Sequence, residues 1–143
     1  MDAPDVTEEP AWRKRLQEKI RTADEALEEV QSGEHLFIGS GAAEPQRLVE
    51  ALVRRANTVF GAEIVHIMTL GLAPYTEPKW GDNFRHNALF IGPNVREAVA
   101  EGRADYTPIF LSEIPRLFET ENAVMVIAEV NKQMPRTLGD CLS

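Results

Sequence analysis

The chain has 143 residues, of which 43% are hydrophobic and 27% charged, and these proportions predict one globular domain rather than a disordered chain. The net charge of −8 argues against nucleic acid as the main partner, because binding to phosphates requires a basic surface. The single cysteine, Cys141, excludes an internal disulfide and a cysteine-based zinc site.

The first ten residues, Met1–Pro10, predict a flexible acidic leader, which leaves residues 11–143 to form the domain. This start is acidic and polar, unlike a secretory signal, in which a basic region precedes an apolar one. No apolar run approaches the length that a membrane span requires. We therefore expect a cytoplasmic protein with no membrane partner.

Two helices are predicted before the first strand. Trp12, Leu16 and Ile20 share one apolar edge of a helix over Ala11–Ile20. A second helix begins at once with a Thr-x-x-Glu capping box, Thr22 to Glu25, and Gly33 ends it.

The stretch from His35 to Asn57 reads as a short apolar strand, a glycine loop and an amphipathic helix. The strand His35–Ile38 ends at the glycine loop, Gly39-Ser40-Gly41, where a backbone without Cβ crowding can turn sharply. The helix then starts near Glu44, whose carboxylate suits exposed N–H groups, and Pro45 suits its first turn. This is half of a βαβ unit.

Strands and helices continue to alternate after this unit. Four further strands are predicted, at Glu63–Leu70, Ala88–Ile91, Tyr106–Leu111 and Asn122–Val130. Helices are predicted from Asn94, as an Asx-type cap, to Gly102 and from Ser112 to Phe118. The long segment Gly71–Asn87 reads as an ordered loop that either binds a ligand or covers the sheet edge with its aromatic residues.

This rhythm predicts an α/β fold with a mainly parallel, Rossmann-like three-layer sheet. Ligands of such sheets bind beyond the carboxyl ends of the strands, here the loops after Ile38, Leu70, Ile91 and Val130. His66, inside the second predicted strand, is favoured as a hydrogen-bonded core imidazole over a catalytic one, because no acidic or thiol partner stands at a telling spacing.

The glycine loop does not match a nucleotide-binding motif. A dinucleotide fingerprint requires a small residue where Glu44 stands, and a carboxylate there would repel a pyrophosphate. No GxxxxGK[ST] motif exists either. Two interpretations stay open, a plain tight turn and a loop that approaches some other ligand.

Four long stretches carry a family resemblance. They read FIGSGAAEPQRLVEAL, HIMTLGLAPY, FRHNALFIGPNVREAVAEGRADYTPIFLSEIPRLF and VIAEVNKQMPRTLGD. With these in order from about Trp12 to Asp140, the chain closely resembles the acetyl-CoA hydrolase/transferase family, which includes 4-hydroxybutyrate and acetate CoA-transferases. The resemblance implies an N-terminal domain of the family I CoA-transferase type, one of two similar α/β domains with the active site between them.

The resemblance also implies a reaction. A glutamate attacks an acyl-CoA thioester, an acyl-glutamyl anhydride forms, CoA returns to give an enzyme thioester, and a second carboxylate takes the CoA. A carboxylate nucleophile must be desolvated, and backbone N–H groups must hold the oxyanion. By resemblance the catalytic glutamate belongs to the C-terminal half, so we assign no catalytic residue to this chain and expect it to be inactive alone.

The resemblance assigns this domain to the wall that holds the acyl or carboxylate end of the substrate. We carry that role to residues on the predicted strand-end loops, namely Gly39, Ser40, Gly41, Glu44, Pro45, Asn87, Asn131, Met134 and Pro135. The expected ligands are an acyl-CoA and a carboxylate, with coenzyme A as part of a substrate and with no metal or tightly bound cofactor. A C-terminal-domain partner or a homo-oligomer would complete the site.

The chain departs from the family pattern at one place. Family members carry a longer segment with another strand between the words SEIPRLF and AEVN, where this chain has only Glu119–Ala123. This predicts a truncated or internally deleted relative, in which the domain is incomplete. Two alternatives to an enzyme part therefore stay open, a non-catalytic interaction module and an inactive remnant of the family.

Overall fold

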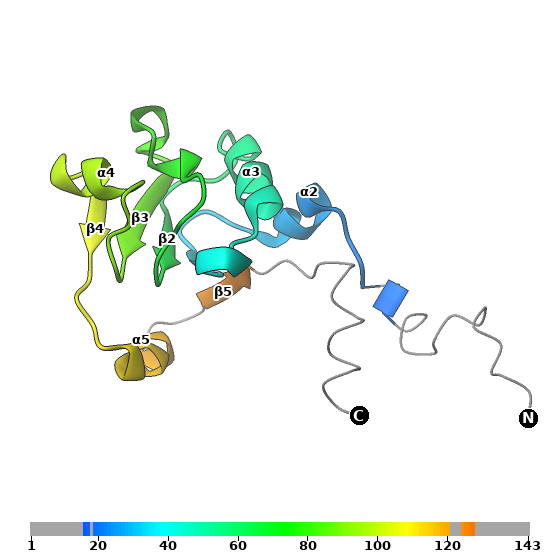
Figure 1. Ribbon diagram of the computed structural model, residues 1–143. Coiled ribbons are helices and arrows are strands. Elements are labelled where there is room, and N and C mark those ends of the chain that lie inside the picture. The colour runs from blue at the N-terminus through cyan, green and yellow to red at the C-terminus, as the bar shows by residue number, and fades with distance from the viewer. Residues whose placement is uncertain (1–15, 18, 121–123, 128–143) are drawn as a thin grey trace, which may run out of the picture.

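The computed structural model describes residues 16, 17, 19–120 and 124–127, and these form a twisted sheet flanked by helices (Figure 1). The strands are β1 His35–Ile38, β2 Ala62–His66, β3 Phe84–Ala88, β4 Ala104–Tyr106 and β5 Val124–Ile127. They lie in the order β4-β3-β2-β1-β5, and every neighbouring pair is parallel. The predicted parallel α/β fold is confirmed.

Helices and short 3-10 turns connect the strands. The helices are α2 Ala23–Ala26, α3 Gln46–Arg54, α4 Arg96–Ala100 and α5 Ile114–Thr120. The 3-10 turns are Leu27–Glu29, Gly41–Ala43, Pro74–Thr76, Pro78–Trp80 and Leu111–Glu113. The predicted capping box is confirmed, since Thr22 and Glu25 exchange side-chain and backbone hydrogen bonds at the start of α2.

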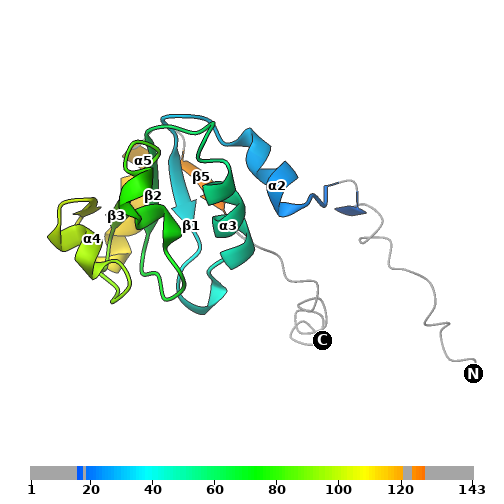
Figure 2. The ribbon, with the colours of Figure 1, turned by 90° about the horizontal axis from the view of Figure 1, so that it is seen from above.

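Helices lie on both sides of the sheet (Figure 2), and the side chains of the strands, which alternate between its two faces, build an apolar layer on each side. Leu36 and Ile64 point to the side of α3, where they pack with Leu52 and its neighbours in the larger core cluster. Phe37 and Val65 point to the other side, where the smaller cluster includes Ile114, Leu117 and Phe118 of α5. The sheet is therefore covered on both faces, as a parallel sheet requires.

The strand order reverses beside β1. The chain runs from β1 through β2 and β3 to β4 in one direction, and then returns by α5 to place β5 on the other side of β1. The parallel pairing of His35 with Val124 and of Ile38 with Ile127 puts the carboxyl ends of β1 and β5 at one edge. Ligands of open α/β sheets bind at such a reversal, which here adjoins the glycine loop.

Three predicted strand boundaries are wrong. The third strand is Phe84–Ala88, in place of the predicted Ala88–Ile91, and β4 is Ala104–Tyr106, in place of Tyr106–Leu111. The second strand ends at His66, well before Leu70. The sequence pattern does not predict β3 at its observed position, because its central residues, Arg85, His86 and Asn87, are polar. Each of their side chains forms a hydrogen bond with a residue that is distant in the sequence.

The beginning and end of the chain lie outside the described residues. The predicted acidic leader Met1–Pro10 and most of the predicted helix Ala11–Ile20 fall there. Of the predicted strand Asn122–Val130, the structure describes residues 124–127.

Candidate functional site

The glycine loop joins the end of β1 to the chain that leaves β2. The Ser40 hydroxyl accepts a hydrogen bond from the Ile67 N–H at 3.0 Å, and the Gly41 N–H donates to the Met68 carbonyl at 3.0 Å. Gly41 has a φ of +65°, which a residue with a Cβ rarely adopts. The loop is thus held by the chain after β2, and glycine is required at its turn.

Glu44 extends this connection with its carboxylate. The Thr69 hydroxyl lies 2.7 and 2.8 Å from the two carboxylate oxygens, and the N–H groups of Leu70 and Gly71 donate to one of them at 3.2 and 3.0 Å. Hydrogen bonds to a charged group are stronger than those between neutral groups. Glu44 therefore fastens the loop after β1 to the loop after β2.

This placement corrects the predicted role of Glu44 as a helix cap. Helix α3 starts at Gln46 with Pro45 at the N-cap position, and no side chain caps it. The Glu44 carboxylate is directed across the edge of the sheet, where the nearby donors occupy it. Hydrogen bonds from these donors stabilise the carboxylate anion and make it a weaker nucleophile, so this geometry does not favour attack by Glu44.

The loop after β3 joins the same assembly through Asn94. Its side-chain N–H group donates to the Gly71 carbonyl at 2.6 Å and to the Thr69 hydroxyl at 3.2 Å. The predicted cap at Asn94 is wrong, because α4 starts at Arg96 without any side-chain cap. We call Ser40, Glu44, Thr69, Gly71 and Asn94 the carboxyl-edge network, since it ties together the loops after three neighbouring strands.

Gly92 permits the close approach of the third loop. A Cβ at Gly92 would lie 2.6 Å from the Thr69 carbonyl oxygen and 2.7 Å from the Asn94 side chain. Both distances are too short for a real Cβ atom. The network therefore depends on a glycine at this position.

A buried aromatic cluster lies beside the network. The Tyr75 hydroxyl and Nε2 of His66 share a hydrogen bond at 2.7 Å, and the His66 and His86 rings stand edge to face with centroids 5.4 Å apart. The ring N–H of His86 donates to the Ile64 carbonyl at 3.1 Å. His66 is thus a hydrogen-bonded core imidazole, and the prediction from the sequence is confirmed.

Burial keeps this cluster uncharged near neutral pH. It lowers the pKa of His66 to about 4, with the neighbouring His86 adding to the shift and Glu44 opposing it. It also lowers the pKa of His86 to about 4, and it raises the pKa of Tyr75. Nδ1 of His66 and Nε2 of His86 have no hydrogen-bond partner among the described residues. The cluster is therefore poorly suited to act as a general base at pH 7.

Asn87 belongs to a different network. Its amide N–H donates to Glu63 at 2.9 Å, its amide oxygen accepts from Thr107 at 2.9 Å, and Glu63 is 2.6 Å from Nδ1 of His35. These contacts cross β1, β2 and β3 and include none with Glu44 or Thr69. The structure does not bring Asn87 to the carboxyl-edge network.

The other predicted wall residues fall into two groups. Gly39 lies between β1 and Ser40, and Pro45 is buried just before α3, so both accompany the network without a side-chain hydrogen bond of their own. Asn131, Met134 and Pro135 lie outside the described residues.

The sequence alone does not single out Thr69, Gly71, Gly92 or Asn94 as site residues. The sequence contains part of the information needed to find them, because Thr69 and Gly71 belong to the stretch HIMTLGLAPY, which includes the end of a predicted strand. Ending that strand at His66 places both residues on its carboxyl-end loop. The sequence predicts Asn94 as a helix cap, because its hydrogen bonds to Thr69 and Gly71 join distant segments and produce no local sequence pattern.

Two features are absent from the described residues. No cluster of three or more histidine, cysteine, aspartate or glutamate residues is arranged to hold a metal ion within them. No helix in that part of the chain has the length and apolar character needed to cross a bilayer.

Comparisons with known proteins agree with the resemblance seen in the sequence. The model of the "Acetyl-CoA hydrolase/transferase N-terminal domain" matches residues 5–124. The chain is 37% identical over 163 aligned positions to the 4-hydroxybutyrate coenzyme A transferase of Clostridium kluyveri, covering 90% of this chain and 38% of that protein. It is 38% identical over 120 positions to a succinyl-CoA:acetate/propanoyl-CoA:succinate CoA transferase of Fasciola hepatica, covering 82% of this chain and 25% of that protein.

Solved structures show the same fold. The crystal structure of RipA from Yersinia pestis superposes with a TM-score of 0.65 and 25% identity, over 76% of this chain and 28% of that one. A point mutant of RipA gives a TM-score of 0.69 over 76% of this chain and 27% of that one. The chain thus spans well under half the length of the relatives it matches.

Proposed function

Because this chain belongs to the acetyl-CoA hydrolase/transferase family, we propose that it forms one wall of a cleft in which coenzyme A passes from an acyl-CoA thioester to a carboxylate. Its relatives from Clostridium kluyveri and Fasciola hepatica are CoA transferases by name. The present chain corresponds to about 38% of the former, so the whole activity needs further polypeptide.

The observation that carries this proposal is the carboxyl-edge network. It is built from the words that carry the family resemblance, with Glu44 from the first, Thr69 from the second and Asn94 from the third. It lies beside the reversal of strand order, which is where α/β sheets bind ligands. A network that fixes three loops gives a cleft wall the rigidity that reactant positioning requires.

We assign the nucleophile to the part of the protein that this chain does not contain. The best placed carboxylate at the described carboxyl edge, Glu44, is held by Thr69 and two backbone N–H groups. The role of Glu44 in the proposed cleft is to position the wall, together with Gly39, Ser40, Gly41 and Pro45.

An internal deletion accompanies this division. The alignment with the Clostridium kluyveri relative runs over 163 positions, which exceeds the 143 residues of this chain. The relative therefore contributes positions that this chain lacks. We place them between α5 and β5, where the sequence leaves only residues 121–123 to connect the two elements.

A reconstitution assay tests the proposal. The purified chain is mixed with butyryl-CoA and acetate, with and without the separately expressed remainder of the Clostridium kluyveri 4-hydroxybutyrate coenzyme A transferase, and formation of acetyl-CoA is followed. We expect exchange only when both parts are present, because the wall and the nucleophile are on different polypeptides.

Two controls make the result decisive. The remainder alone must give no exchange, and a Glu44→Ala chain should support less exchange than the original chain in the same mixture. Turnover by the chain alone would refute the assignment of the nucleophile. The matching segment of the Clostridium kluyveri protein is tested in the same mixture. If that segment restores exchange to the remainder and this chain does not, the proposal that this chain forms a cleft wall is refuted. An interaction module or an inactive remnant is then favoured.

A further inference from the structure

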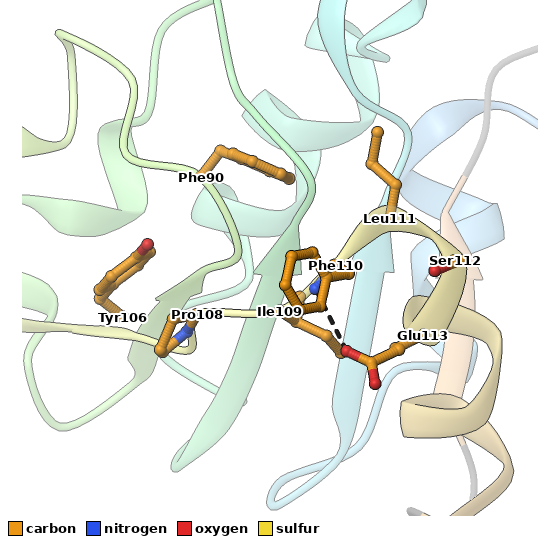
Figure 3. A pocket seen from close by; sticks show the side chains of 8 residues that line it. All are labelled: Phe90, Tyr106, Pro108, Ile109, Phe110, Leu111, Ser112 and Glu113. Carbon is orange, nitrogen blue, oxygen red and sulfur yellow. Dashed lines mark hydrogen bonds between the residues drawn. The ribbon is translucent and has the colours of Figure 1, made fainter.

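An apolar groove of about 750 Å³ opens at the carboxyl ends of β3 and β4 (Figure 3). It is lined by Phe90, which follows β3, by Tyr106, the last residue of β4, and by residues 108–113, which lead into α5. Its size falls within the range of roughly 300–1,000 Å³ that small-molecule sites occupy. None of these residues belongs to the carboxyl-edge network.

Exposed apolar side chains border the groove. The Phe110 side chain is 76% exposed and that of Leu111 is 63% exposed. Figure 3 shows the side chains of Phe90, Tyr106 and Phe110 bordering one open region, although they come from three separate segments. Clustered exposed apolar residues of this kind mark binding surfaces.

The charge of the lining restricts what can bind. No lysine, arginine or histidine is present among the lining residues, and the one charged group is the Glu113 carboxylate. That carboxylate accepts a hydrogen bond from the Phe110 N–H at 3.4 Å, at the rim of the groove. A phosphate or a carboxylate would find no cationic partner in this lining and would be repelled by Glu113.

The groove adjoins the carboxyl-edge network through the chain after β3. The Phe90 N–H donates to the Ile67 carbonyl at 2.9 Å, and Gly92, two residues later, packs against the Thr69 carbonyl. The groove and the network therefore adjoin, so an acyl-CoA whose thioester lies at this edge of the sheet can extend its acyl chain over Phe90 into the groove.

We infer that this groove holds the hydrocarbon chain of an acyl group, so that the protein selects linear monocarboxylic acyl groups over dicarboxylic ones. This inference rests on the proposed function, since it names the acyl class that the cleft would take. Each methylene that leaves water for an apolar site strengthens binding by up to about fourfold. A dicarboxylic acyl group does not bind more tightly in this way, because its second carboxylate must be desolvated beside Glu113.

The test is a residue-resolved NMR titration of the full 143-residue chain with the N-acetylcysteamine thioesters of butyrate, hexanoate and succinate, each referred to by its acid; the first two are neutral and the third keeps one carboxylate. We expect saturable shifts of the amides of residues 109–113, with hexanoate binding about tenfold more tightly than butyrate, and no saturable shift with succinate. Phe110→Ser and Leu111→Ser should each weaken hexanoate binding at least about fivefold. Phe60→Ser, at a phenylalanine that is 53% exposed and lies at the opposite edge of the sheet, should leave hexanoate binding unchanged.

Three results would overturn the inference. They are the absence of saturable shifts in the groove, equal binding of all three compounds, and an equal loss of hexanoate binding in the Phe60→Ser control. Chemical-shift changes that increase with the protein concentration instead of the ligand concentration would indicate that a second copy of the chain binds this surface. That result also contradicts the inference. If hexanoate binds at the groove but the reconstituted enzyme shows no thioester exchange, the proposed function is refuted, whereas the assignment of the groove to a hydrocarbon chain stands.

Discussion

At the scale of single residues, Glu44 is the side chain on which most of the carboxyl edge depends. Its carboxylate is the common acceptor for Thr69, Leu70 and Gly71, and Thr69 also meets Asn94. Removing the acceptor leaves the buried Thr69 hydroxyl and the half-buried Gly71 N–H without it, which costs more than the lost hydrogen bonds themselves.

Glu44→Ala should lower the free energy of unfolding by about 2–3 kcal/mol, and Glu44→Gln by about half as much, because the amide oxygen can still accept. Urea denaturation of the chain measures both. Glu50→Gln on the exposed side of α3 is the matched control and should change stability by less than about 0.5 kcal/mol. Equal effects of the substitutions at 44 and 50 would contradict the network.

The two buried imidazoles predict an acid-sensitive stability. The pKa of His66 and of His86 is about 4 in the folded protein against 6.5 for an unperturbed imidazole, so the unfolded chain binds protons first as pH falls. Their contribution is complete above pH 6.5 and declines between pH 6.5 and about 4, on the order of 3 kcal/mol for each ring.

Urea denaturation at several pH values between 4 and 6.5 measures the slope of the free energy of unfolding against pH. His86→Phe keeps an aromatic ring without a titrating group, so the slope should fall by about half even though the Ile64 carbonyl loses its donor. An unchanged slope in His86→Phe would show that carboxylates elsewhere account for the acid sensitivity.

At the scale of elements, the glycines after β2 and β3 allow the loops to approach one another, but they are not equally necessary. A Cβ at Gly71 would meet the end of the Gln46 side chain, which can move, whereas a Cβ at Gly92 would meet the Thr69 carbonyl, which is backbone. Gly92→Ala should therefore destabilise the chain by about 2–3 kcal/mol and Gly71→Ala by about 1 kcal/mol or less.

Thermal or urea unfolding of the two alanine variants checks this order. Gly81→Ala serves as the control, since its Cβ would lie at an ordinary 3.5 Å from the Pro78 carbonyl. A Gly71→Ala variant less stable than Gly92→Ala would mean that the loop after β3 is not packed as the structure has it.

The elements also show what sequence patterns can predict. The apolar run His35–Ile38 and the box Thr22 to Glu25 are local signals, and both are confirmed at the predicted residues. Strand β3 is displaced from its predicted position, because Arg85 and Asn87 bond to partners on β4 and β2 rather than joining an apolar layer. Pairing between distant segments has no local signature, so tertiary context decides these boundaries.

The same limit applies to the candidate site. Ser40, Gly41 and Glu44 can be predicted, since a glycine loop after a strand marks the ligand edge of a parallel sheet. Thr69 and Asn94 cannot, because their importance comes from hydrogen bonds between segments 25 residues apart in the chain. Asn87 satisfies the strand-end rule only when β3 is placed too late in the sequence.

At the scale of the whole molecule, the fold has one edge suited to ligands and one that is not. All five described strands run in parallel, so their carboxyl ends gather the glycine loop, the carboxyl-edge network and the apolar groove at the same side of the sheet. Under the proposed function, we therefore expect this edge to face the further polypeptide and the acyl-CoA.

Amide hydrogen–deuterium exchange of the chain tests this expectation most directly, measured before and after adding the remainder of the Clostridium kluyveri relative together with butyryl-CoA. We predict new protection in the carboxyl-edge loops, residues 39–45, 67–72 and 90–94, and none in the loops at the opposite edge, residues 57–61 and 81–83. Protection confined to residues 57–61 and 81–83 would contradict it.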